Sequence, residues 1–261
     1  MNSDLYFRKN RIKFLIFVLL IVALTKISSN LLEFNFYIIF ENFQNATSRF
    51  VRLYFPANFE SLQKLLEGVW VSFILAVSSG MVGSLLASIA ALFMSKKTFK
   101  NKIVRSVIRI ISTFIRNIPS TIWAIILLIS FWYGEFLGFL VMTLGTFGFN
   151  ARVFSDIFDE SDSNSIEALN SVGANNISII GQSIIPNAWP SIVSWTLYAI
   201  ETNIRDSVII GMLAGGGIGQ LIDIYRNFRR FDELTSAVIL IVALVLIFDR
   251  LSIVLREKLQ W

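Results

Sequence analysis

The 261-residue sequence contains no cysteine and no histidine, and proline occurs only four times. Disulfides, thiol chemistry, imidazole bases and the common zinc ligands are therefore excluded. The glycine-rich phosphate loop G-x-x-x-x-G-K-[ST] is absent from the whole chain, so the sequence offers no recognisable nucleotide site. We predict no catalytic residue, no metal site and no cofactor bound by this chain.

Apolar residues are abundant instead. They make up 55% of the chain, and the mean hydropathy is +0.66, which indicates an integral membrane protein. The net charge is +5, but the basic residues flank apolar runs, which is the topology signal of membrane proteins. We therefore expect membrane lipid as a partner and exclude nucleic acid.

Six apolar stretches predict an all-α membrane protein with about six transmembrane helices. They are residues 14–27, 68–94, 120–133, 136–149, a stretch that starts near residue 190, and 234–255. A span needs about 20 apolar residues, so the two 14-residue runs must extend beyond their apolar cores or tilt little. Small residues recur along 68–94, which predicts close packing against other helices.

Charge sets the expected topology. Basic clusters precede the first run, follow the second and close the chain, which places both termini in the cytoplasm. The first run lacks a cleavage site and is predicted to be an uncleaved anchor. Three arginines fall on the outer side in this topology and violate it mildly: Arg226, Arg229 and Arg230.

We divide the chain into two parts. Residues 1–67 form an N-terminal anchor helix and an outer loop, in which an interfacial helix is left open; residues 68–261 form the transmembrane domain, with a polar loop at about 150–189. No internal repeat is visible, which argues against an inverted-repeat transporter. Within the domain, one polar stripe has helical spacing: Arg105, Arg109, Ser112 and Arg116. It predicts an amphipathic helix at the headgroup surface or extending a span, and Pro119 is expected to break the chain after it.

Residues 165–186, which we call the polar elbow, are not explained by the bilayer. Asn164 is predicted to cap a short helix with Glu167 three residues later, and Gly173 to end it in a left-handed conformation. Asn175 or Asn176 then starts a second helix, which Pro186 ends. Apolar residues line one face of each helix, and a partner groove would bury them; packing against the chain's own helices is the alternative.

The elbow resembles the E-A-A-x-x-x-G-x₉-I-x-L-P loop of the permease subunits of ATP-binding-cassette (ABC) importers. The resemblance implies a type I importer permease fold, in which this loop is a coupling helix held by the ATPase subunit. The implied docking residues are Glu167, Ala168, Leu169, Gly173, Ile177 and Pro186. The sequence departs from the pattern at Leu169, Ser183 and Ile185.

Two flanking segments resemble phosphonate-type permeases. Residues 116–119 and 123–124 match R-x-I-P-x-x-x-W-A, and residues 198–205 with 216–219 match Y-x-x-E-x-N-x-R and G-G-I-G. Methionine-type permeases share the glycine element, so that part separates the subfamilies poorly. The resemblance covers about residues 60–258.

Polar residues in the fifth span are candidates for the translocation path. Glu201 and Arg205 are spaced to pair along one helix, and intramembrane charges are costly unless they pair or face water. Arg205 and Asn203 either line an anion path or only hold helices together. Gly215, Gly216, Gly217 and Gly219 predict a bent or re-entrant segment that forms an outer gate.

The resemblance implies a membrane-spanning, non-catalytic permease subunit in the cytoplasmic (inner) membrane of a bacterial cell. Its expected partners are an ABC ATPase dimer that binds ATP and magnesium, an extracytoplasmic substrate-binding protein and a second copy of itself. The implied substrate is phosphonate or a related small phosphorus oxyanion, and methionine or another small solute is the alternative. An ion-coupled secondary transporter or channel subunit, with Glu201 or Asp249 at the ion site, is the alternative from a different class.

Overall fold

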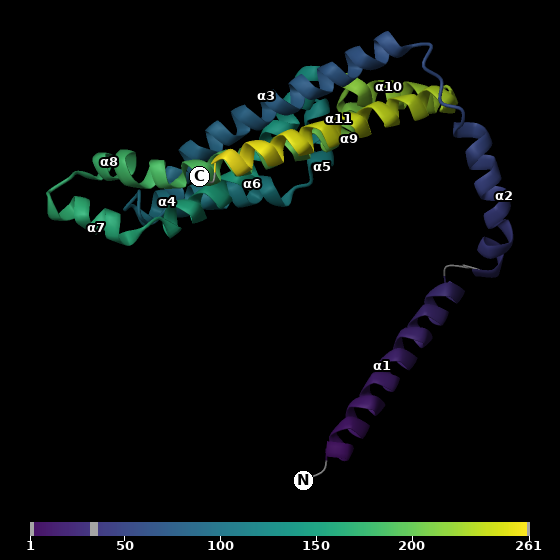
Figure 1. Cartoon of the computed structure of the whole chain (residues 1–261), viewed down its shortest axis with the longest axis horizontal. Coiled ribbons are helices and arrows are strands. Elements are labelled where there is room, and N and C mark those ends of the chain that lie inside the picture. The colour runs from purple at the N-terminus through teal and green to yellow at the C-terminus, as the bar shows by residue number, and fades with distance from the viewer. Residues whose placement is uncertain (1–2, 32–35, 260–261) are drawn as a thin grey trace. The chain divides into compact units, whose positions relative to one another are not determined.

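The structure is a computed structural model that describes the backbone of residues 3–31 and 36–259. The described elements are helices joined by short connections (Figure 1). Contacts divide the chain into two units, Met1–Leu53 and Tyr54–Trp261, and each is described by itself. The division into an anchor region and a transmembrane domain at residue 67 stays a prediction.

The first unit contains α1 (Ser3–Leu31) and nearly all of α2 (Phe36–Tyr54). Residues 11–31 of α1 are apolar and long enough to cross a membrane, in agreement with the predicted run at 14–27. α2 lies in the segment that we expected to be an outer loop. Its 19 residues form a regular amphipathic helix.

The second unit is a bundle of long helices with a projecting short-helix segment (Figure 1). In chain order it comprises α3 (Leu62–Met94), α4 (Lys102–Asn117), α5 (Ser120–Leu128), α6 (Glu135–Glu160), α7 (Ser163–Ser171), α8 (Asn176–Ile179), a π-helical turn (Ile180–Ile184), α9 (Ile185–Ala214), α10 (Gly217–Asn227) and α11 (Phe231–Leu259). α7 and α8 form the projecting end of the unit.

The expectation of about six membrane helices in an all-α protein is confirmed. Within residues 3–31 and 36–259, four helices are long and apolar enough to cross a membrane: α3, α6, α11 and the apolar part of α1. Two bent pairs bring the number to as many as six, because α4 and α5 meet at 91° and the long helix ending at Ala214 meets α10 at 53°. The first bend lies at Pro119, as predicted.

The predicted span at 120–133 is wrong in length, since α5 has only nine residues. The chain after α5 is held across the end of α9 instead of continuing as a helix. The Gly134 N–H donates to the Ala214 carbonyl at 2.6 Å, and the ring of Tyr133 lies against Gly215. These tertiary contacts outweigh the apolar composition that made the run look helical.

Close approach of α3, α6 and α9 forms the centre of the unit, as the small residues of α3 predicted. A Cβ on Gly80 would lie 2.5 Å from Ile200 Cγ1 of α9, and one on Gly83 would lie 2.7 Å from Thr146 Cβ of α6. Because a real Cβ does not approach other atoms this closely, both positions require glycine at these interhelical distances.

Buried amides connect the same three helices. Asn203 Nδ2 on α9 donates to Ser79 Oγ on α3 at 3.1 Å and to Thr146 Oγ1 on α6 at 3.0 Å. One turn of α3 further on, Asn150 Nδ2 of α6 donates to Ser84 Oγ at 2.8 Å. Such hydrogen bonds between membrane helices satisfy polar groups that hydrocarbon would leave unpaired.

The predicted amphipathic helix is α4, and the middle of its polar stripe faces the protein, whereas Arg116 at its end is exposed. Ser112 is buried and donates to the Gly148 carbonyl, and Arg109 donates to the Met94 carbonyl at 3.3 Å. The apolar side chains of Ile103 and Ile110 are exposed on the other face. α4 therefore presents an apolar surface outward, which suits the membrane interface expected from the sequence.

Candidate functional site

The first helix of the elbow begins at a different cap from the one predicted. Asp162 is the N-cap of α7, and its carboxylate accepts from the N–H groups of Asn164 at 3.1 Å and Ser165 at 3.0 Å. The Ser165 hydroxyl donates to the same carboxylate at 2.6 Å. These hydrogen bonds hold the pKa of Asp162 below its usual range, and the bond from the Ser165 hydroxyl has the largest effect. The predicted capping box from Asn164 to Glu167 is wrong, because Asn164 lies inside the helix.

Gly173 ends α7 in the left-handed conformation that the sequence predicted, with φ of +77°. The Ala174 N–H donates to the Leu169 carbonyl and the Gly173 N–H donates to the Asn170 carbonyl, each at 3.0 Å. This pair of bonds is the Schellman motif, which satisfies carbonyls that a helix end leaves unpaired. The motif turns the chain sharply into α8.

Asn175 begins the second helix, since its side chain accepts from the Ser178 N–H at 2.8 Å. Pro186 does not end this helix, contrary to the prediction. The chain passes through the π-helical turn at 180–184 into α9, where Pro186 occupies the first turn. A wider π turn accommodates the missing proline N–H and its ring. The fifth span therefore starts before Pro190, which lies inside α9.

The apolar residues of the elbow divide into two sets. Ile166, Leu169 and Ile180 pack on a core built from α3, α6 and the start of α9, which was the alternative interpretation. Val172 and Ile177 do not: they are 80% and 81% exposed and stand on either side of the Gly173 turn. Glu167, Ala168 and Pro186 are also exposed. The elbow thus has a packed base and an exposed apolar tip.

The base of the elbow is tied to the end of α3. The Asp159 carboxylate at the end of α6 accepts from Ser95 Oγ at 2.6 Å and from the Lys96 N–H at 2.7 Å. Lys97 Nζ donates to the Ser161 carbonyl and to Ser163 Oγ, the latter at 3.3 Å. These contacts fasten the elbow to the ends of both α3 and α6.

Glu201 of α9 pairs with two arginines. It forms an ion pair with Arg205 one turn along, as the spacing predicted. A second ion pair, with Arg256 of α11, has Nη2 and Oε2 3.1 Å apart, and Arg256 also donates to Ser252 Oγ. The Glu201 carboxylate is buried, whereas the Arg205 side chain is 49% exposed. Three charges on two helices leave one excess positive charge on this part of the bundle.

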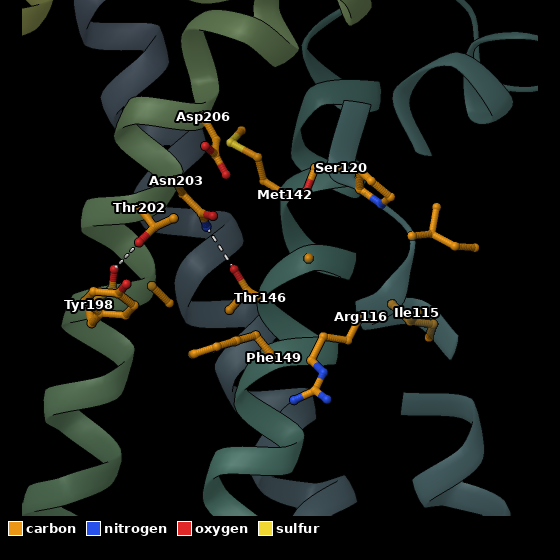
Figure 2. A pocket seen from close by; sticks show the side chains of 14 residues that line it. Ile115, Arg116, Ser120, Met142, Thr146, Phe149, Tyr198, Thr202, Asn203 and Asp206 are labelled. Atoms are coloured by element: carbon orange, nitrogen blue, oxygen red, sulfur yellow. Dashed lines mark hydrogen bonds between the residues drawn. The ribbon is translucent and has the colours of Figure 1, made fainter. Parts of the chain in front are cut away.

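A cavity of about 260 Å³ lies on an adjacent face of α9, between α6 and the bend that joins α4 to α5 (Figure 2). It is lined by Ile115, Arg116, Ile118, Pro119, Ser120, Met142, Gly145, Thr146, Phe149, Tyr198, Ala199, Thr202, Asn203 and Asp206. Figure 2 shows Asp206, Met142 and Ser120 toward one end, with Arg116 and Phe149 toward the other. Asn203 lines this cavity; Glu201 and Arg205 do not.

The glycine cluster forms the bend that the sequence predicted between α9 and α10. Gly215, Gly216 and Gly217 have φ of +83°, +112° and +59°, which glycine adopts far more readily than other residues. The turn packs tightly: Ser72 Oγ of α3 accepts from the Ile218 N–H at 2.9 Å, and Gly219 lies against Gly211. Its assignment as a gate stays a prediction.

The chain matches the family of binding-protein-dependent transport system inner membrane components over residues 83–259, more than half its length. It belongs to this family. The putative phosphite transport system permease protein HtxC of Stutzerimonas stutzeri is 26% identical over 207 residues, which cover 79% of this chain and 73% of the relative. The methionine import system permease protein MetP of Bacillus subtilis is 33% identical over 138 residues, covering 50% of this chain and 62% of the relative.

A solved structure of the MetNI methionine ABC transporter, in an inward-facing conformation, has the same fold. It aligns with a TM-score of 0.68 and 20% identity, and covers 77% of this chain and 98% of that chain. The predicted type I importer permease fold is confirmed, and the chain is a non-catalytic membrane subunit of an ABC importer. The ion-coupled transporter and channel interpretations are set aside with this family assignment. The residues that the structure describes contain no group of three or more acidic side chains able to hold a metal.

Several residues of the site were missed by the sequence analysis. Arg256 and Ser252 come from α11 and meet Glu201 only in the folded bundle. Asp206 follows Arg205 directly, yet it lines the cavity while Arg205 does not, because successive residues of a helix point about 100° apart. The signal for Arg116 was present in the R-N-I-P segment, but we had assigned that arginine to a surface stripe.

Proposed function

We propose that two copies of this chain form the translocation path of an importer for phosphonate, phosphite or a related small phosphorus oxyanion. A separate ATPase dimer binds ATP and magnesium and drives transport, and an extracytoplasmic binding protein delivers the substrate. The resemblance to phosphonate-type permeases supports the substrate class, as does the phosphite permease that is similar over 79% of the chain.

The exposed tip of the elbow is the observation that carries the coupling role. Val172 and Ile177 place two large apolar side chains in water, although the Schellman turn and the Asn175 cap define their backbone closely. An apolar pair on a rigid support fits a cleft in a soluble partner. Docking there would move α3 and α6 through the contacts of Asp159 and Lys97 described above.

The path is proposed to run along α9. Its exposed side chains follow one stripe, Tyr198, Arg205, Ile209 and Leu213, and the cavity opens beside this stripe. An exposed guanidinium in a membrane span is costly against lipid. It is favourable beside a water-filled path, where it attracts anions and forms paired hydrogen bonds with their oxygens. A second copy that covers this stripe would enclose such a path, with the elbow in the cytoplasm and the glycine bend at the outer end as a gate.

The coupling role can be tested by purifying the chain together with the products of its neighbouring genes and measuring whether an ABC ATPase co-purifies. We expect Ile177→Asp and Val172→Asp to lose ATPase co-purification, because each puts a charge into the contact. Gln182→Glu adds a charge to the same elbow at another exposed position and should retain the ATPase. Equal retention in all three variants would contradict docking at the tip.

Methionine stays a candidate substrate because the methionine permease is 33% identical over half the chain. Uptake by the reconstituted transporter distinguishes methionine from a phosphorus oxyanion as the substrate. ATP-dependent accumulation of labelled phosphite or phosphonate, with no competition by methionine, supports the proposal. Accumulation of methionine alone contradicts the substrate assignment and leaves the coupling assignment intact.

A further inference from the structure

α2 has one aromatic and one polar face. At 100° per residue, Phe40, Phe43, Phe50 and Tyr54 fall within one arc of the helix, and Asn45, Ser48, Arg49 and Arg52 fall within the opposite arc. Phe40 is 87% and Phe43 is 66% exposed. The helix is therefore strongly amphipathic, and it is not among the helices apolar enough to cross a membrane.

The chain on both sides of α2 holds it at one membrane surface. α1 and α3 each contain a candidate span, and α2 is separated from them by residues 32–35 and 55–61. A chain extends at most about 3.6 Å per residue, so the two connections reach roughly 18 Å and 29 Å. α2 cannot leave the zone at which α1 ends and α3 begins, whichever side of the membrane that is.

The last residue of α2, Tyr54, belongs to the second unit. The rings of Tyr54 and Phe231 lie 5.2 Å apart. Four residues on, the Asn58 N–H donates to the Asp232 carbonyl at 3.2 Å, and the Ser236 hydroxyl donates to the Asn58 carbonyl. These contacts hold residues 54–58, which directly follow the rest of α2 in the chain, at the start of α11, and that start is the boundary of a candidate span.

We propose that α2 is an interfacial helix that binds the lipid surface, with its phenylalanines at the headgroup–acyl boundary and its polar face in water. An aromatic face that cannot leave the membrane surface removes apolar area from water most directly by entering the lipid. Two arginines and one glutamate, Glu41, leave the helix cationic, which favours phosphate headgroups over an acyl-only environment.

The absence of cysteine makes this placement directly measurable. We would introduce Phe43→Cys and Asn45→Cys one at a time, spin-label each, and place the full-length transporter complex in lipid nanodiscs. Collision of the label with oxygen reports lipid, and collision with a water-soluble nickel chelate reports water. Leu246→Cys, exposed on the spanning helix α11, and Lys100→Cys, exposed in the polar connection between α3 and α4, are the lipid and water standards.

The label at residue 43 is expected to match the lipid standard, and the label at residue 45 the water standard. Phe40→Cys provides a second position on the aromatic face and should behave like residue 43. Two outcomes would overturn the inference. Nickel access at both 43 and 45 would mean that α2 stands free in water, and exclusion of both reagents from 40 and 43 would mean that protein covers this face.

Discussion

The turn between the two helices of the elbow depends on the backbone conformation of one residue, Gly173. Its φ of +77° is left-handed, and no atom lies within 4 Å of the place where a Cβ would be. A side chain there would meet no obstacle, so the cost of a substitution is confined to the backbone. For an L-residue that cost is about 1–2 kcal/mol.

We expect Gly173→Ala to loosen the Schellman turn and to lower the fraction of permease that co-purifies with ATPase by several-fold. Gly181→Ala is the matched control, because Gly181 lies in the same elbow, also has open space at its Cβ position, and has no left-handed φ. ATPase co-purification and ATP-dependent uptake would be measured for both. Identical values for the two variants would show that the turn does not position the docking tip.

Residue-level signals were informative where only one residue type fits the backbone. Gly173 was predictable because a left-handed helix end strongly favours glycine. The N-cap of α7 was not predictable, because Asp162 and Asn164 are both good N-cap residues. The spacing from Asn164 to Glu167 favoured Asn164, whereas the structure uses Asp162. Which of these two residues caps α7 depends on where α6 ends. The contacts of Asp159 with the end of α3 fix the end of α6.

At the scale of elements, the long apolar runs predicted α3 and α11 well, because lipid and the protein core select the same apolar composition. α6 extends beyond its 14-residue apolar run, as expected. The breaks were harder. Pro119 does bend the chain, whereas Pro186 is absorbed by a π turn and Pro190 lies within α9. A proline therefore marks a place where the helix must adjust, and tertiary packing decides whether it stops. α10 was missed as a helix because the glycines before it obscure where it begins.

Packing of α3 on α6 depends on Gly83. An added methyl group would lie 2.7 Å from Thr146 Cβ and 2.9 Å from the Thr143 carbonyl oxygen, and a carbonyl on a packed helix has little freedom to move. We expect Gly83→Ala to destabilise the bundle by roughly 1–3 kcal/mol, measured as a lower midpoint of thermal aggregation in detergent. Gly134→Ala, whose Cβ would meet nothing within 4 Å, should leave the midpoint unchanged. A midpoint for Gly83→Ala equal to that of wild type would mean that the two helices separate readily.

For the whole molecule, the charges of α9 connect stability with transport. Glu201 is shared by two arginines that differ in their surroundings. Arg256 also contacts Ser252 and bridges α9 to α11, so its removal leaves a buried carboxylate with fewer partners. Arg205 lies on the same helix as Glu201 and contributes no link to another helix through this pair. Its exposed side chain is therefore available to the path in a way that Arg256 is not.

This difference leads to opposite expectations for two variants. Arg205→Ala should assemble with the ATPase normally but reduce phosphonate or phosphite uptake by about tenfold, the effect of losing one charged hydrogen bond of about 1.5 kcal/mol. Arg256→Ala should instead lower the yield of assembled complex, because it removes an interhelical ion pair. Uptake per assembled transporter and the amount of complex would be measured for each. If Arg205→Ala fails to assemble, the arginine is structural; if it assembles and transports at the wild-type rate, the anion path does not pass this guanidinium.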